Sequence, residues 1–346
     1  MSKMHPLTPS PSGNHQQKLS QGRRLGLTLR YRRLCSTTEI NQVGLTPCPT
    51  SSPSDLHALA VYADPQTAQF WVDVFGIGSQ RGYTKAAGSH AVMAPLAGIG
   101  SGRFASLRSG GAVQPGQGVE HRGNSLVVHD LVTGKTALEI KQATAGPLAW
   151  SCQGTALAAG EARNRVGVWD ARSGARIGRV VGHIDEVTHA AFTPDSKLVT
   201  LSRDGTVRIT DPQTARTLSK LEVDATSGTN PRALAVSPDG QSVVSLWGAT
   251  LLIWLPCAGQ LTSYGLHAAR GSEGWPLCIS PDCRWMACRT EDGFDIVDVA
   301  AGSVVWEGGG GAAMFTAAAF STDGKVLVLG RMDGVVEVWD VEEREG

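Results

Sequence analysis

The residues of this chain most capable of chemistry are a histidine, a serine and an aspartate within one stretch: His183, Ser202 and Asp204. Serine hydrolases use these residue types: the histidine removes the proton of the nucleophilic serine, and the aspartate orients the imidazole ring. Their spacing would allow the three side chains to meet. Because buried polar groups must be hydrogen-bonded, the same trio could instead form a self-satisfying structural network. We favour the structural role.

No other pattern indicates an enzyme. The chain has no P-loop, no H-E-x-x-H and no G-x-S-x-G, which are the motifs of phosphate binding, zinc proteolysis and serine hydrolysis. Its nine histidines are scattered without the spacing of metal ligands. We therefore predict no catalytic residue, no cofactor and no metal. An enzyme built on the same fold is the weaker alternative.

The cysteines do not indicate a disulfide framework or a zinc site. The chain has seven of them, an odd number, and none forms a C-x-x-C pair. Cys278 and Cys288 fall on a strand and on the strand that returns after the next turn, so they could be cross-strand neighbours. Free thiols are the simpler interpretation, and they favour a reducing, intracellular compartment, cytoplasmic or nuclear.

Charge and hydropathy separate the N-terminal segment from the rest. The net charge is zero, but residues 1–53 carry seven Lys or Arg and one acid, Glu39. A basic, acid-free start resembles an organelle transit peptide, and it could also bind the phosphates of nucleic acid. Alternation at Leu25, Leu27, Leu29 and Tyr31 favours a strand instead. No apolar run reaches the ~20 residues that span a bilayer, so we expect no membrane partner.

A repeat of about 42 residues organises the second half of the chain. Small-residue turns begin at Ser151, Thr193, Ser237, Ser280 and Ser321, with spacings of 42, 44, 43 and 41 residues. A second marker follows each turn by 17 or 18 residues, at Trp169, Thr210, Trp254, Val297 and Trp339. Two markers in one register argue against chance. A period of 40–45 residues made of short strands is typical of a β-propeller.

The repeat that begins at Gly182 shows the expected unit of four strands. Apolar runs at 190–192, 198–202 and 207–211 are separated by turn residues, and a last strand is expected around 216–221. The tight turn between the second and third strands contains Asp204-Gly205, the dipeptide favoured in hairpins because glycine adopts positive φ without strain.

These features resemble the WD40-repeat family. The resemblance rests on Gly182-His183, Ser202, Asp204 and the closing dipeptides Trp169-Asp170 and Trp339-Asp340. It implies a buried tetrad of His, Ser or Thr, Asp and Trp in each repeat, here His183, Ser202 and Asp204, with Thr210 in place of the tryptophan. In the family these residues tie the loop before the first strand to the tight turn.

Extending the register toward the N-terminus predicts the whole architecture. We expect an all-β, seven-bladed propeller of four-stranded antiparallel blades, clear over residues 144–343 and degenerate over 36–142. The last repeat lacks an outer strand, and an open ring would expose strand edges. Residues 25–31 are predicted to supply that strand and close the ring. The propeller then covers 21–346, with residues 1–20 as a disordered tail.

The expected function is that of a protein-interaction scaffold, because propeller strands form the core and the loops around the channel remain for binding. A protein or peptide partner is favoured, with an RNA- or chromatin-associated propeller as the alternative. Aromatic residues and arginine dominate interface hot spots. The predicted partner-binding residues lie on the rim: Arg163, Asp185, Glu186, Arg203, Arg232, Trp275 and Phe315. Trp275 and Phe315 could instead be core residues between blades.

Overall fold

All regular elements of the described chain are β-strands. A computed structural model describes residues 24–35, 40–47, 56–63, 69–77, 82–89, 92–94, 103–108, 125–130, 133, 135–141, 143, 146–223, 230–265, 275–291, 293–309 and 314–344. Within these ranges there is no helix, and hence none long and apolar enough to cross a membrane. The predicted all-β class is confirmed. The predicted tail, residues 1–20, lies outside the described ranges.

The strands of the described residues form seven four-stranded antiparallel sheets. Two N-terminal sheets contain β2 (Ile40–Pro47), β3 (Leu56–Ala63), β4 (Gln69–Gly76) and β5 (Gly82–Ser89), then β6 (Val92–Ala94), β7 (Arg103–Arg108), β8 (Ser125–Asp130) and β9 (Thr136–Lys141). The next two contain β10 (Leu148–Trp150), β11 (Ala156–Glu161), β12 (Arg165–Asp170) and β13 (Arg176–Val180), then β14 (Val187–Phe192), β15 (Leu198–Ser202), β16 (Thr206–Asp211) and β17 (Arg216–Glu222).

The C-terminal sheets continue the same order until the last one. They contain β18 (Pro231–Val236), β19 (Val243–Trp247), β20 (Thr250–Leu255) and β21 (Gln260–Gly265), then β22 (Trp275–Ile279), β23 (Trp285–Arg289), β24 (Gly293–Asp298) and β25 (Ser303–Gly309). The last sheet has the order β26 (Phe315–Phe320), β27 (Val326–Arg331), β28 (Val335–Arg344) and β1 (Arg24–Leu34).

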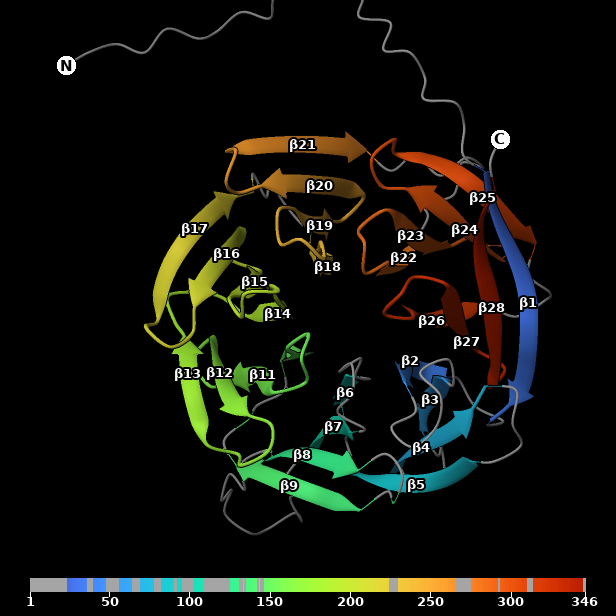
Figure 1. Cartoon of the computed structure of the whole chain (residues 1–346), viewed down its shortest axis with the longest axis horizontal. Coiled ribbons are helices and arrows are strands. Elements are labelled where there is room, and N and C mark those ends of the chain that lie inside the picture. The colour runs from blue at the N-terminus through green and yellow to red at the C-terminus, as the bar shows by residue number, and fades with distance from the viewer. Residues whose placement is uncertain are drawn as a thin grey trace, which may run out of the picture.

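The sheets are arranged as blades around a central axis (Figure 1). The first strand of each blade lies innermost, and neighbouring inner strands pack against each other, as in β10 with β14, β14 with β18, and β22 with β26. Adjacent blades also touch through backbone. Arg179 N donates to Pro212 O at 2.9 Å, and a Cβ added to Gly178 would lie 1.8 Å from that oxygen. The β-propeller class is therefore confirmed.

Burial along each blade explains the sequence pattern. The five residues of β15 are all buried, because a second strand has a blade on each of its two faces. The outer strand β17 is mostly exposed, with a burial pattern that alternates only weakly. Full burial of one leucine such as Leu198 contributes about 1.5–3 kcal/mol. Middle strands are thus short continuous apolar runs, which is how the sequence shows them.

The small-residue turns that mark the repeat are held by their own first residue. Ser237 Oγ accepts a hydrogen bond from Ser242 N at 2.9 Å, and Ser321 Oγ accepts one from Val326 N at 2.9 Å. A hydroxyl at this place closes the turn between the first and second strands. The Ser or Thr that begins each of these turns therefore recurs in the sequence because its hydroxyl closes the turn.

The predicted closing strand is present. β1 pairs antiparallel with β28 from Arg24 opposite Arg344 to Leu34 opposite Val335. Leu25 is buried in the adjoining core, and Arg30 Nε donates to Asp340 Oδ2 at 2.9 Å. The pairing also extends the last strand to Arg344, beyond the Trp339-Asp340 dipeptide. Ring closure thus covers the edge that the last repeat would leave open.

Candidate functional site: rim and central channel

One end of the ring is built from two kinds of loop that are bonded to each other. Arg203 N, in a tight turn between second and third strands, donates to Glu186 O, in the loop before the first strand, at 2.9 Å. Met332 N donates to Met314 O at 2.9 Å in the same way. We call these loops and tight turns the rim. They contain most of the predicted partner-binding residues.

A buried polar network fastens the rim of the β14–β17 blade. His183 Nδ1 lies 2.9 Å from Asp204 Oδ2, and His183 Nε2 lies 2.8 Å from Thr200 Oγ1. Thr206 Oγ1 donates to Asp204 Oδ1 at 2.6 Å, and Ile184 N donates to Asp204 Oδ2 at 3.2 Å. We call His183, Thr200, Asp204 and Thr206 the latch. It connects the loop before β14 to the tight turn after β15.

The structure places Thr200, not Ser202, against the histidine ring, so the predicted trio is only partly brought together. Ser202 Oγ donates to Asp185 O at 3.0 Å and accepts from Asp204 N at 3.1 Å. Residues 200 and 202 share one face of β15, because side chains alternate along a strand. Spacing could not decide which of them the imidazole reaches.

The latch lacks the contact that a nucleophilic catalyst needs. The hydroxyl of Ser202 donates to a main-chain carbonyl, and the Nε2 of His183 is engaged by Thr200. Ser202 is 0% exposed, so a substrate could not reach its oxygen. A nucleophile and its base must lie within hydrogen-bond reach of each other. The arrangement is that of a structural network.

Burial and hydrogen bonding set the charges in the latch. Burial lowers the pKa of His183 from its ordinary value, although the Asp204 carboxylate acts in the opposite direction. For Asp204, burial raises the pKa, but hydrogen bonds from Thr206 and His183 outweigh it and the net shift is downward. At neutral pH the latch therefore pairs a neutral imidazole with a carboxylate.

The residue in place of the fourth tetrad member is not satisfied. Thr210 is 0% exposed, and its Oγ1 has no hydrogen-bond partner among the described residues. The corresponding residue of the last blade is Trp339, whose Nε1 donates to Glu337 Oε2 at 3.1 Å. The buried hydroxyl is thus a local defect of the β14–β17 blade.

The last blade fastens its rim with ions instead of a histidine. Arg331 Nη1 donates to Glu337 Oε1 at 2.9 Å, and its Nη2 donates to Asp333 Oδ2 at 2.7 Å. Arg32 on the closing strand adds an ion pair to Glu337 at 2.7 Å. Glu337 is 2% exposed, so its charge depends on these partners. We call Arg32, Arg331, Asp333 and Glu337 the ion cluster.

The predicted rim residues of the β14–β17 blade are exposed next to the latch. Arg203 Nη1 lies 3.3 Å from Glu186 Oε2, and both side chains are 51% exposed. Asp185 is also exposed, and its Oδ1 accepts from Glu186 N at 2.7 Å. Ile184 directly precedes Asp185 and is 85% exposed. It was not among the binding residues predicted from the sequence. We call Ile184, Asp185, Glu186 and Arg203 the rim patch.

Other predicted residues fall in different places. Arg163 is exposed in a tight turn, with a left-handed φ of 64°. Phe315 is 1% exposed and stacks edge-on against Phe294 at 5.2 Å, so it is a core residue and its rim assignment is wrong. Trp275 is the first residue of β22, but its side chain lies outside the described part of the structure. Arg232 faces the channel instead of the outer rim.

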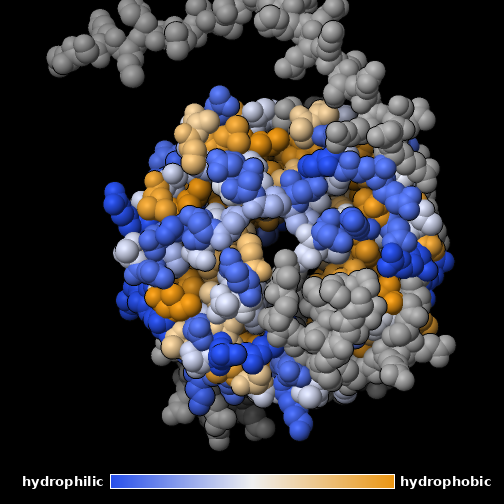
Figure 2. Space-filling model, in the orientation of Figure 1, coloured by the Kyte–Doolittle hydropathy of each residue, from blue (hydrophilic) through white to orange (hydrophobic). Residues whose placement is uncertain are grey.

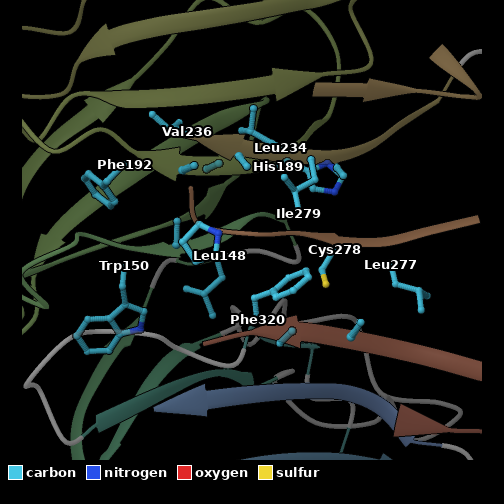
Figure 3. Close-up of a pocket in the computed structure, with 18 of the residues that line it drawn as sticks. Leu148, Trp150, His189, Phe192, Leu234, Val236, Leu277, Cys278, Ile279 and Phe320 are labelled. Carbon is cyan, nitrogen blue, oxygen red and sulfur yellow. The ribbon is translucent and has the colours of Figure 1, made fainter. Parts of the chain in front are cut away.

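A cavity of about 570 Å³ occupies the middle of the ring (Figure 3). It is lined by the inner strands β2, β10, β14, β18, β22 and β26, whose side chains there are mainly Ala, Val, Leu and Ile. Figure 2 shows an opening at the centre of the viewed face, with hydrophilic residues around much of it. His189 also lines the cavity. Burial lowers its pKa, while a hydrogen bond to the Arg232 main chain opposes the shift.

The described cysteines are free thiols, of which Cys283 and Cys288 are buried, whereas Cys152 and Cys257 are exposed. Burial raises the pKa of both Cys283 and Cys288 to about 12, and that of Cys278 also rises through burial. Cys278 and Cys288 lie on neighbouring strands but are not directly opposite, since Cys278 lies opposite Ala287 and Cys288 opposite Pro276 across a bulge. Thiols held protonated are weak nucleophiles. No group of metal ligands occurs among the residues that the structure describes.

Comparisons with known proteins agree with this architecture. The family model described as "WD domain, G-beta repeat" matches residues 174–211 and 307–340. The chain is 31% identical over 174 residues to "Small ribosomal subunit protein RACK1y" of Oryza sativa subsp. japonica, covering 46% of this chain and 49% of that protein. The match thus spans about half the length of the relative. The two matched segments coincide with β13–β16 and β25–β28, so the chain contains WD40 repeats within its β-propeller.

Proposed function

We propose that this chain is a non-catalytic scaffold, a closed seven-bladed ring that binds a protein or peptide on its rim. The observation that carries the proposal is the rim patch. A nearly fully exposed isoleucine stands beside an exposed ion pair, on loops that the latch and the tight turn hold in place. An apolar anchor surrounded by both charges, on a rigid support, is a suitable hot spot for a protein partner.

Two further observations support a scaffold over an enzyme. The polar groups that resembled a catalytic trio are engaged with each other or with main chain. The relative named RACK1y is called a ribosomal subunit protein, which fits a role in assembly. A partner protein or peptide, without a cofactor, is therefore the expected ligand.

The alternative of nucleic-acid binding through the basic N-terminal segment is less well supported. Of its arginines, Arg30 is bonded to Asp340, and Arg32 to Glu337. Charges that close the ring are less available to neutralise phosphates. Buried free thiols fit an intracellular location, cytoplasmic or nuclear, which is part of the proposal.

The rim patch can be tested by affinity capture from the native cell with mass spectrometry. Replacing Ile184 and Arg203 together by alanine should remove specific partners while leaving the melting temperature within about 2 °C, because surface substitutions change stability little. Leu218→Ala on the outer strand, a 48% exposed leucine, is the matched control. Equal capture by wild type, double variant and control would exclude the rim patch.

Trp275 can be tested in the same assay. If it is a rim anchor, the Arg203→Ala, Trp275→Ala variant should lose partners and keep its thermal stability. A large fall in melting temperature would instead assign Trp275 to the core between blades.

A further inference from the structure

We propose that the rim of the last blade is an oxidation-sensitive surface, on which peroxide converts two exposed methionines, Met314 and Met332, to sulfoxides while the fold stays intact. The reaction turns an apolar part of the rim into a polar one. This modification site lies on a different blade from the rim patch and does not depend on the proposed function.

The main chain holds the two methionines side by side. Met314 lies just before β26, and Met332 lies in the tight turn between β27 and β28. Met332 N donates to Met314 O at 2.9 Å. The same turn is bonded to the closing strand, because Cys35 N donates to Gly334 O at 3.0 Å. Both side chains are therefore presented at one end of the ring by loops that backbone hydrogen bonds fix in place.

Exposure separates this pair from the methionine in the core. Met314 is 40% exposed and Met332 is 47% exposed, whereas Met286 on β23 is 0% exposed. An oxidant must reach the thioether sulfur, so oxidation follows exposure. Met286 can react only when its blade opens, and the opening of core strands costs up to the whole free energy of unfolding. The structure thus predicts two reactive methionines and one protected methionine.

A third apolar side chain extends the surface that the pair forms. Leu34, the last residue of β1, is 66% exposed. It lies opposite Val335, which follows Met332 by three residues. Leu34, Met314 and Met332 thus cross the rim of one blade, from the loop before its inner strand to the end of its outer strand. We call these three residues the apolar stripe.

The proposed step is the transfer of one oxygen atom to sulfur. Hydrogen peroxide gives this atom to the thioether, so an S=O bond forms, the O–O bond breaks, and water leaves; sulfur is oxidised and peroxide is reduced. A thioether is apolar, whereas a sulfoxide is polar, so the apolar stripe loses two of its three members. Methionine sulfoxide reductase, with a thiol as reductant, returns the thioether and releases the oxygen as water.

Peptide mass spectrometry after graded exposure to peroxide tests the sites. The full chain, with its exposed thiols blocked beforehand, is digested, and each methionine peptide is followed for a gain of one oxygen, about 16 Da. We expect Met314 and Met332 to oxidise at least about tenfold faster than Met286, because the unfolded fraction of a native protein is small. In urea the three rates should become similar. Three further methionines are followed separately, since they or their side chains lie outside the described structure: Met1, Met4 and Met93.

Retention on a phenyl hydrophobic-interaction column measures the change of the surface. Oxidised wild type should elute earlier, and sulfoxide reductase should restore its retention. The Met314→Leu, Met332→Leu variant keeps apolar side chains that peroxide does not oxidise, so its retention should shift much less. Met286→Leu is the matched control and should shift as wild type does. The melting temperature of each protein should stay within about 2 °C after peroxide treatment, since surface changes alter stability little.

Four results would overturn the proposal. They are equal oxidation rates of Met286 and the rim pair in the folded chain, unchanged retention of wild type after both rim methionines are oxidised, an undiminished shift in the double leucine variant, and a melting temperature that falls as the pair is oxidised. If the double variant does not fold, Met314→Leu and Met332→Leu are used singly, and each should remove part of the shift.

Discussion

The β14–β17 blade and the last blade fasten the same two rim loops with different chemistry. In the first, a neutral histidine and hydroxyl groups surround Asp204. In the last, Arg331 connects Asp333 to Glu337 with direct ion pairs. Ser202 and Arg331 occupy equivalent positions, two residues before the aspartate of the tight turn. The position two residues before the turn aspartate therefore needs a polar side chain that joins the two rim loops, and either a serine or an arginine can do this.

The difference has consequences for stability. The charges of a buried ion cluster attract each other strongly. Removing one of them destabilises the fold strongly, because the remaining charge stays buried without its partner. A neutral network loses less per member, but it includes an imidazole whose pKa is lowered by burial, so acid weakens it. The two blades should therefore respond oppositely to mutation and to acid.

The largest effect is expected in the ion cluster. Arg331→Ala should lower the free energy of unfolding by about 3 kcal/mol, because Glu337 then remains buried with fewer partners. Urea denaturation measures the change. Lys220→Ala, which breaks an exposed pair with Glu222, is the control and should cost under about 1 kcal/mol. Similar losses in both variants would mean that the cluster behaves as a surface pair.

A substitution in the latch should lower the free energy of unfolding by less than Arg331→Ala does. His183→Ala leaves Asp204 and the Thr200 hydroxyl without a buried partner, so we expect a loss of about 2 kcal/mol in the same urea measurement. His183→Gln keeps a polar group there and should recover part of it. A loss equal to that of Arg331→Ala would remove the contrast between the two blades.

Acid should distinguish the blades more clearly than mutation. The folded-state pKa of His183 is depressed, so the unfolded chain binds its proton first, and stability is lost as pH falls below about 6.5. His189 acts in the same direction. Urea midpoints at pH 7 and pH 5 should differ in wild type and in Arg331→Ala, and differ less in His183→Gln. An undiminished difference in His183→Gln would assign the effect to other groups.

The smallest predicted effect is a gain. Thr210→Val removes a buried hydroxyl that has no partner while keeping the shape of the side chain, so stability should rise by about 1 kcal/mol. Thr200→Val is the matched control and should destabilise, because that hydroxyl bonds His183. A loss of stability in Thr210→Val would show that its hydroxyl has a partner after all.

The comparison of these blades also shows where sequence-based reasoning was sufficient. The place of Asp204 in the tight turn and of His183 before the first strand followed from the family pattern, and both lie in the latch. The pattern suggested Ser202 where the imidazole meets Thr200, because two residues on one strand face cannot be ranked by spacing. The cluster around Arg331 gave no signal, since its partner Arg32 is about 300 residues away in the chain.

Residues at the rim were harder to assign. Glu186 and Arg203 were expected to be exposed and are, whereas Phe315 proved to be core and Arg232 proved to line the channel. An aromatic or an arginine at the start of an inner strand can point to either side of a blade. Only the packing of neighbouring blades decides between them.

The sequence by itself determined the repeating blade and the strand that closes the ring, because turn residues and alternating apolar residues are local signals with fixed spacing. The tertiary structure alone decided which hydroxyl meets His183, which charges surround Glu337, and that Arg232 lines the channel. These depend on side chains brought together from distant parts of the chain, and no local spacing records such contacts.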